Sequence, residues 1–220
     1  MKKYSLIIFV ALASVLTTYA DDEWIDLFDG KSLKGWRANV MPESFSVVEG
    51  TIRAQATKTR PRRKSAHLFY VGNDEEIVRL KNFEFEATVR SEPNSNAGIF
   101  IHTDMSTRDK SLHLAKGYEI QLNSSKKEKR KTGSLYAIVD LDESPVDESK
   151  WFTVRIKVEG KRIRVYVKGK QVVDYTEPEN PVRPKNRAGR LLDPKGGAIA
   201  LQAHDPDSIF YFKDLRIRSL

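Results

Sequence analysis

The chain has 220 residues, with 38 Lys and Arg against 30 Asp and Glu (a formal net charge of +8 at pH 7), and it contains no cysteine. Without cysteine, the chain has no disulfide, cysteine metal site or cysteine-linked lipid anchor, so an ordinary hydrophobic core must stabilise it. Much of the positive charge lies in two runs, 58–64 and 126–131. In an exported protein we interpret these runs as solvated loops, attracted to anionic glycans or the cell envelope, rather than as a nucleic-acid surface.

The first residues predict export. Lys2 and Lys3 precede an apolar run, 6–16, and residues 18–20 place small side chains before a cut between Ala20 and Asp21. This pattern is typical of a cleaved signal peptide, and the apolar run is too short to cross a bilayer core of about 30 Å. We therefore expect a signal peptide at 1–20 and one domain at 21–220, periplasmic or extracellular and without membrane insertion.

Alternation of apolar and polar residues dominates the rest of the chain. It predicts antiparallel strands at 24–28, 45–48, 51–56, 67–71, 83–90, 97–103, 118–122, 134–138, 154–158, 163–167, 172–175, 198–203 and 209–218. Tight turns at Gly160 and Gly169 make a meander of three of them. This pattern predicts an all-β fold, an antiparallel jelly-roll β-sandwich. The proline-rich segment 178–194 is expected to be a long surface loop, either a binding element or a crossover between sheets.

Six short motifs resemble, in order, the bacterial 3-keto-disaccharide hydrolase domain family. They are LFDGKSLKGW at 27–36, NAGIF at 96–100, GYEIQL at 117–122, GSLY at 133–136, LQAH at 201–204 and FKDLRI at 212–217. The resemblance implies a concanavalin A-like jelly roll of the lectin and glucanase type. It also implies an extracytoplasmic protein that acts on oligosaccharides or glycosides already oxidised at C3 of one ring.

A ketone at C3 changes how a glycosidic bond can break. It acidifies the C2 hydrogen, so a base can form an enolate that expels the C1 substituent, and water then adds. This route needs a base near C2, a donor at the C3 oxygen and an acid for the leaving group. The chain has no dinucleotide loop, so a sugar 3-oxidoreductase must supply the ketone. The alternatives are a non-catalytic carbohydrate-binding module and a conventional glycoside hydrolase, which needs a second carboxylate.

Two residues are the first candidates for catalysis. Glu119 and Gln121 share one face of a predicted strand, and Glu119 is the candidate base unless it is a surface carboxylate. His204, with Gln202 on the same face, is a candidate base, acid or metal ligand unless it is a structural histidine. The family commonly has an acidic residue before this histidine and a glycine after it, whereas this chain has Ala203 and Asp205.

Further candidates would bind the substrate or a metal. His102 stands where the family often carries an arginine, and we expect it on the face of Gly98 and Phe100. Tyr136 could donate to a sugar oxygen, and Trp36 could stack on a sugar ring or pack in the core. His102, Glu119 and His204 are suitable ligand types for a divalent ion, but their spacing is no metal signature and the chemistry does not demand one.

Overall fold

The structure is a computed structural model that describes residues 23–58, 64–73 and 76–220. The expected signal peptide, residues 1–20, lies outside the described residues. None of the helices described is long and apolar enough to cross a membrane. The elements are β1 (Ile25–Asp26), β2 (Trp36–Ala38), η1 (Pro42–Ser44), β3 (Phe45–Val48), β4 (Thr51–Ala54), β5 (Ala66–Tyr70), β6 (Phe83–Ser91), β7 (Asn96–Thr103), β8 (Tyr118–Asn123), β9 (Phe152–Glu159), β10 (Arg162–Val167), β11 (Lys170–Thr176), η2 (Lys185–Arg187), β12 (Ala198–Ala203) and β13 (Phe210–Ser219).

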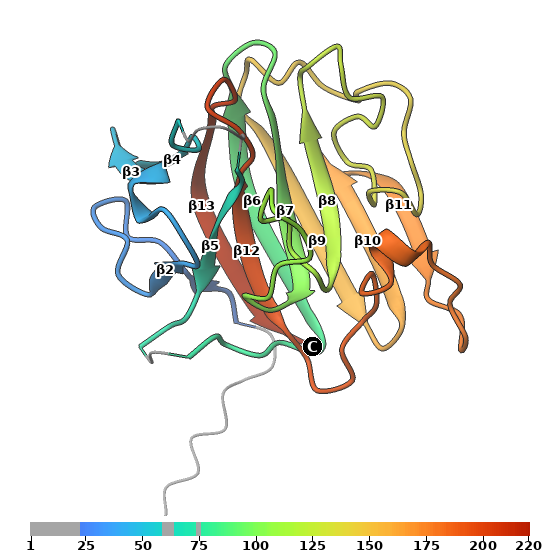
Figure 1. The fold of residues 1–220 in the computed structure, drawn as a ribbon. Coiled ribbons are helices and arrows are strands. Elements are labelled where there is room, and N and C mark those ends of the chain that lie inside the picture. Colours follow the sequence, from blue (N-terminus) through green and yellow to red (C-terminus); the bar gives the residue numbers. More distant parts are fainter. Residues whose placement is uncertain (1–22, 59–63, 74–75) are drawn as a thin grey trace, which may run out of the picture.

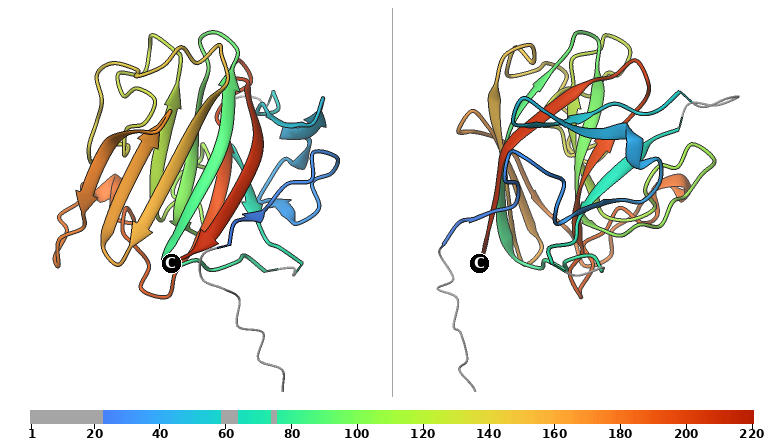
Figure 2. Two further views of the ribbon diagram at one scale, coloured as in Figure 1. Left: turned by 180° about the vertical axis from the view of Figure 1, so that it is seen from behind. Right: turned by 90° about the vertical axis from the view of Figure 1, so that its left-hand side faces the viewer.

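Two antiparallel sheets pack face to face (Figures 1 and 2), as the alternation predicts. The larger sheet has the order β11-β10-β9-β6-β13-β4-β3, with β1 paired to β13, and the smaller sheet has the order β2-β5-β12-β7-β8. Chain neighbours β12 and β13 belong to different sheets, and so do β6 and β7. The segments that connect them, 204–209 and 92–95, therefore cross from one sheet to the other.

The larger sheet buries one face and exposes the other to water. In β6 and β9, buried and partly exposed side chains alternate, and the buried set includes Phe83, Phe85 and Ile156 at 0 % exposure. Burying such a side chain contributes roughly 1.5–3 kcal/mol. On the outer face, charges pair across strands, with Arg216 on Glu86 at 2.6 Å. The alternation of apolar and polar residues in the sequence therefore reflects the one buried and one exposed face of this sheet.

The smaller sheet is buried on both faces. Every residue of β8 and β12 is buried, although alternate side chains point away from the core between the sheets. On the outer face, Phe69, Phe100 and Leu114 form a second apolar cluster. The segment 104–116 and the loop 178–194 cross this face and are joined by the amide of Gly117, which donates to the carbonyl of Gly189 at 2.9 Å. Side chains on this face are therefore held beneath loops instead of facing open water.

One predicted strand is wrong. Residues 134–138 form a tight turn, in which Leu135 makes isolated bridges to Ile120 and Val139 and Ala137 has a φ of 60°. The backbone therefore turns back on itself here, and the alternation has no sheet to join. The strand β2 was not expected, and β1 is shorter than the predicted 24–28. The meander of β9, β10 and β11 is confirmed.

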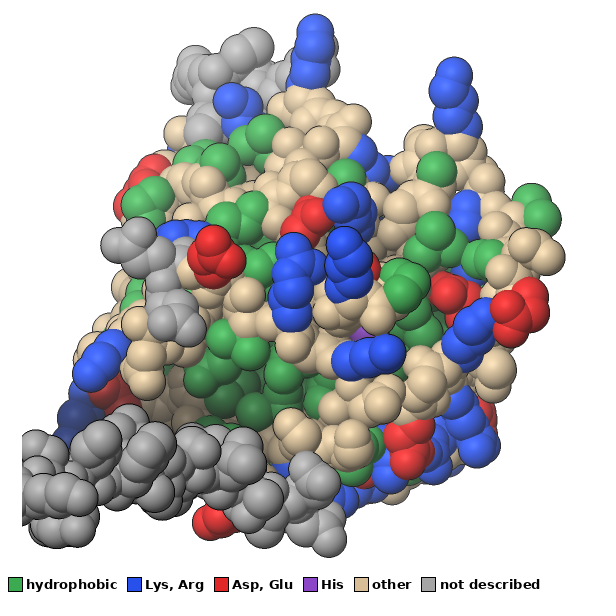
Figure 3. Space-filling model, turned by 90° about the horizontal axis from the view of Figure 1, so that it is seen from below, with side chains coloured by type: hydrophobic (Ala, Val, Ile, Leu, Met, Phe, Trp, Pro, Cys, Tyr) green, Lys and Arg blue, Asp and Glu red, His purple; other side chains and the backbone are tan. Residues whose placement is uncertain are grey.

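The charges are spread over the surface. Seen from below, Lys and Arg side chains stand among Asp and Glu side chains around a hollow with hydrophobic walls (Figure 3). On this face the excess of positive charge is distributed among acids rather than gathered into a single stripe.

Candidate functional site

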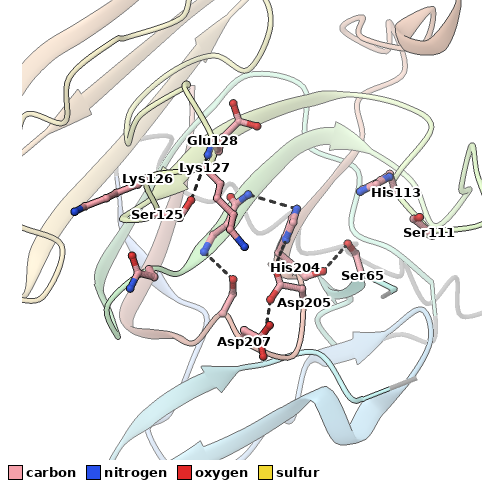
Figure 4. A pocket seen from close by; sticks show the side chains of 13 residues that line it. Ser65, Ser111, His113, Ser125, Lys126, Lys127, Glu128, His204, Asp205 and Asp207 are labelled. Carbon is pink, nitrogen blue, oxygen red and sulfur yellow. Dashed lines mark hydrogen bonds and ion pairs between the residues drawn. The ribbon is translucent and has the colours of Figure 1, made fainter. Parts of the chain in front are cut away.

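A pocket of about 710 Å³ opens at one end of the sandwich, where the two crossing segments meet the loop after β8 (Figure 4). Backbone amides bind these segments together: Asn96 donates to Ser208 Oγ, and Ile209 donates to Ser95 Oγ, each at 2.9 Å. The lining residues are Ser65, Asn94, Asn96, Ser111, His113, Ser125, Lys126, Lys127, Glu128, His204, Asp205, Asp207 and Ser208. Polar and titratable side chains therefore dominate its wall.

His204 follows β12 and forms a pair with the next residue. Its Nδ1 lies 2.8 Å from Asp205 Oδ2. Burial alone would raise the pKa of Asp205, but the hydrogen bonds from His204 and from the amide of Asp207, with the charge of His204, lower it to about 2. A carboxylate that stays ionised at neutral pH favours a proton on Nδ1. The lone pair of His204 is then on Nε2.

Amide side chains support this tautomer from the other side of the ring. Asn96 Nδ2 lies 3.4 Å from His204 Nε2, and Gln121 Nε2 donates to Asn96 Oδ1 at 2.8 Å. Because an amide NH₂ only donates, Asn96 favours Nε2 as an acceptor. Gln121 therefore stands behind Asn96 in a chain that ends at His204, rather than in the wall of the pocket.

A second histidine–aspartate pair lies beside the first. His113 Nδ1 is 2.8 Å from Asp109 Oδ2, and the ring centroids of His113 and His204 are 6.3 Å apart. Burial would raise the pKa of Asp109, but its hydrogen bonds from the side chain and backbone of His113 outweigh this and lower the pKa. The wall thus holds two imidazoles side by side, each oriented through Nδ1 by a carboxylate.

Glu119 shares the outer face with these groups but does not line the pocket. Its Oε2 accepts a hydrogen bond from Arg190 at 2.7 Å, and both side chains are less than a tenth exposed. Its carboxyl group lies over Gly98, where an added Cβ would come within 3.0 Å of Glu119 Oε1. The loop 178–194 thus delivers the cation that neutralises Glu119, and the catalytic role of Glu119 stays a prediction.

Two more predicted residues lie beneath or beside the pocket. Gln202 is buried, and its Nε2 lies 3.4 Å from Nε2 of His67, a histidine on β5. Burial, with the charges of His113, His204 and Arg190, lowers the pKa of His67 to about 3. Tyr136 donates its hydroxyl to Glu128 Oε2 at 3.0 Å, so it reaches the pocket only through Glu128.

The expectation that His102 shares a face with Gly98 and Phe100 is wrong. His102 has a φ of 50°, and the pairing of β7 with β12 shifts register beside it. This break in alternation turns the ring toward the main core, where it stacks on Phe83 at 6.1 Å. Its Nε2 lies 3.0 Å from the carbonyl oxygen of Lys81.

Trp36 packs in the core, the alternative left open by the sequence. It is 7 % exposed, its Nε1 donates to the carbonyl of Leu27 at 2.7 Å, and its ring meets Tyr70 edge-on at 5.4 Å. The surface that a sugar could stack on is therefore covered.

The three suggested metal ligands do not converge, because His102 points into the core and Glu119 is paired with Arg190. In the part of the chain that the structure describes, no three His, Asp or Glu side chains are grouped to hold a metal ion. These residues do not fit the suggested metal site, and the chemistry below is derived from the protein's own groups.

Sequence reasoning missed His113, Asp109, Asn96 and Arg190 as site residues. One signal was available for His113, because the chain has only four histidines and each could have been tested as a partner for His204. The adjacency of His204 and Asp205 also pointed to a histidine–carboxylate pair. Arg190 gave no signal, since it lies 71 positions from Glu119 in a loop without periodicity.

Several solved structures share the fold. A proposed glycosyl hydrolase from Parabacteroides distasonis superposes with a TM-score of 0.72 at 19% identity, over 90% of this chain and 94% of that one. A carbohydrate-binding module from Bacillus subtilis gives 0.56 at 13% identity, over 84% and 96%. The β-glucanase of Bacillus licheniformis gives 0.56 at 11% identity, over 90% and 97%. These likenesses show a jelly roll that carries both glycosidases and binding modules, so the site must decide function.

A search of curated protein sequences finds no match. The family model described as the 3-keto-alpha-glucoside-1,2-lyase-like domain matches residues 23–218, which include both crossing segments and the two histidine–aspartate pairs. This chain therefore belongs to the family of 3-keto-alpha-glucoside-1,2-lyase-like domains.

Proposed function

We propose that this protein cleaves 3-keto-glycosides by elimination followed by hydration. The observation that carries the proposal is the His204–Asp205 pair, with Nε2 as the lone-pair nitrogen, beside the His113–Asp109 pair. The C2 hydrogen and the C1 oxygen of a glycoside lie on adjacent carbons. Two adjacent imidazoles suit one proton transfer at each of these positions.

His204 acts as the base. The bound substrate displaces the 3.4 Å contact of Asn96 from Nε2. This nitrogen then takes the C2 proton, and the electrons of the C–H bond form the enolate of the C3 ketone. As the ketone re-forms, a double bond forms between C1 and C2 and the C1–O bond breaks. His113, when protonated, gives its proton to the departing oxygen. Water then adds to the enone, with its oxygen at C1 and a proton at C2, to give the free 3-keto sugar.

A conventional glycoside hydrolase fits the pocket less well. Such enzymes need one carboxyl group that stays protonated as an acid and a second that is ionised. Burial would raise the pKa values of Asp205 and Glu128, but hydrogen bonds lower both. The pKa of Asp205 falls to about 2. That of Glu128 is lowered chiefly by the amide of Arg130 and the hydroxyl of Tyr136. Neither carboxyl group is held in the protonated form that a general acid requires.

A non-catalytic binding module is the second candidate, favoured by the likeness to the Bacillus subtilis module. Binding modules hold sugars largely by stacking on aromatic rings. Among the residues that the structure describes, those that line this pocket include no Trp, Tyr or Phe. The polar lining therefore favours proton transfer over stacking.

The proposed reaction also implies which enzyme precedes it and in which compartment it occurs. Its substrate must be oxidised at C3 before it arrives, so a sugar 3-oxidoreductase supplies it. The amino-terminal pattern of Lys2, Lys3 and the apolar run 6–16 supports export, so the reaction belongs to the periplasm or the exterior.

The test uses the chain from Asp21 with matched 3-keto and unoxidised disaccharides, with and without chelator. We expect enone absorbance and released monosaccharide only from the keto form, and exchange of the C2 hydrogen in D₂O. His204→Ala is expected to lower kcat by about 10²–10⁴-fold and to abolish exchange. His113→Ala should slow release while it retains exchange at C2.

The controls separate the alternatives. If Glu119→Gln, verified as folded, loses C2 exchange while His204→Ala retains it, Glu119 is the base and the assignment to His204 is wrong. Equal turnover of the unoxidised disaccharide would point to a conventional hydrolase. Binding without turnover of any keto substrate would point to a binding module.

A further inference from the structure

The basic run 126–131 divides into groups with different surroundings. Lys131 Nζ donates to the carbonyls of Ser125 and Glu128, each at 2.9 Å, and Arg130 pairs with Asp140 at 2.9 Å. These two cations hold the loop together. Lys126, Lys127 and Lys129 are exposed, but only Lys126 and Lys127 line the pocket.

The ammonium groups of Lys126 and Lys127 are not compensated. Among the described residues, neither has a hydrogen-bond or ion-pair partner. The acids of the same wall are engaged elsewhere: Glu128 with Arg130 and Tyr136, and Asp205 with His204. Asp207 likewise has an interaction partner. Two lysines without a partner therefore line a pocket whose carboxylates are already occupied.

The two lysines lie on a different side of the pocket from the second imidazole. In Figure 4, Lys126 and Lys127 extend from the loop after β8 on one side of His204, and His113 with Ser111 lies on the other. Because His113 meets the leaving oxygen at C1 and His204 meets C2, the side of the keto ring away from the leaving oxygen faces the lysines. A volume of about 710 Å³ is within the range of sites that enclose a whole small molecule.

We propose that the substrate carries an anionic group, a carboxylate or a sulfate or phosphate ester, that Lys126 and Lys127 bind on the side of the keto ring away from its leaving oxygen. The proposal rests on the proposed function and names its substrate class, acidic 3-keto-glycosides. Charge-assisted hydrogen bonds to an anion are stronger than those to a neutral hydroxyl. The lysines thus favour acidic over neutral substrates.

The test compares three 3-keto disaccharides with the same leaving sugar, whose keto ring is a neutral hexose, the corresponding uronic acid or the 6-sulfate of that hexose. We expect kcat/KM to be at least about tenfold higher for an acidic form, mainly through KM. Because salt screens exposed charges, the preference should shrink at high ionic strength. The uronate and sulfate arms tell which anion is bound.

The double variant Lys126→Gln with Lys127→Gln should lose the preference while it keeps the rate on the neutral disaccharide. Lys129→Gln is the matched control, since it removes an exposed charge of the same run that does not line the pocket, and it should keep the preference. Equal kcat/KM for neutral and acidic forms in the wild type, or a preference that survives in the double variant, overturns the proposal.

Calorimetric binding of the unoxidised uronate and neutral disaccharides separates the two proposals. The first outcome is that no keto substrate is turned over, the uronate binds more tightly than the neutral disaccharide, and only the Lys126–Lys127 variant loses this difference in affinity. The catalytic proposal then fails and the anion site stands. If turnover occurs without any discrimination in rate or binding, the catalytic proposal stands and the anion site fails.

Discussion

His67 is fully buried on β5, beneath the two histidines of the pocket. Its ring meets Phe100 edge-on at 5.2 Å, and burial lowers its pKa from the ordinary value of 6.5 to about 3. An imidazole of this kind is neutral in the folded protein. It supports the wall behind His204 by packing and does not exchange protons at physiological pH.

This buried histidine makes the folded state sensitive to acid. Between pH 6.5 and about 3 the unfolded chain binds a proton at His67 that the folded chain does not, so stability falls as pH falls. The slope reaches about 1.4 kcal/mol per pH unit, or up to about 5 kcal/mol over the window. His67→Gln removes this contribution, and urea unfolding at pH 7, 6, 5 and 4 measures it. Parallel pH profiles for the two proteins would contradict the expectation.

At the scale of elements, the loop 178–194 shapes the outer face of the smaller sheet. Glu177, just before the loop, accepts the hydroxyl of Tyr118, and Arg183 donates to the hydroxyls of Tyr118 and Tyr175 at 2.8 and 2.6 Å. These bonds fix the loop where it leaves β11. Its far end then brings Arg190 to Glu119, with the guanidinium also over the Phe100 ring at 5.3 Å. The loop is thus the crossover from the larger sheet to the smaller one, and it also supplies the partner of Glu119.

Removal of the cation alone is expected to be costly. Arg190→Met leaves the carboxyl group of Glu119 buried without its partner cation, so we expect a loss of about 3–5 kcal/mol in the free energy of unfolding. Arg190→Met with Glu119→Leu removes both charges and should recover most of this loss, because an apolar pair of similar volume replaces a desolvated ion pair. Urea unfolding of the wild type, the single variant and the double variant measures the coupling. A double variant no more stable than the single one would show that the pair is not coupled.

Elements of the larger sheet were predictable, and those that frame the pocket were less so. Buried and exposed residues alternate along β6, β9 and β10 because one face of the sheet is in water and the other is in the core. Residues 134–138 have a similar pattern but form a turn, since Gly133 and Ala137 both have positive φ. His102 shows the same limit, because a register shift reversed the face that its position in the strand predicted.

At the scale of the whole molecule, both ends of the described chain meet in the larger sheet. β13 lies in its interior, between β6 and β4, whereas β1 adds only Ile25 and Asp26 at its side. β13 also supplies the fully buried Phe210, Phe212 and Leu215. The last strand of the described chain therefore completes the core.

Deletion of residues 210–220 is expected to abolish folding, because it leaves β6 and β4 each with one unpaired edge and removes buried aromatic side chains, each worth about 3–5 kcal/mol. Deletion through Asp26 is the matched control, and it should cost little because both residues of β1 are exposed. Far-UV circular dichroism and the soluble fraction on expression measure both. A folded chain without β13 would contradict this account of the core.

The sequence by itself determined the sandwich, the expected export signal and the sugar-directed family, because period-two alternation, short signals and ordered motifs are local features. It also identified His204 and the face shared by Glu119 and Gln121. Only the tertiary structure decided which groups meet. The His204–Asp205 pair acquires its neighbour His113 from another segment, and Glu119 acquires Arg190 from a third. Loops that cross a sheet make such contacts by packing, and packing between distant segments leaves no period in the sequence.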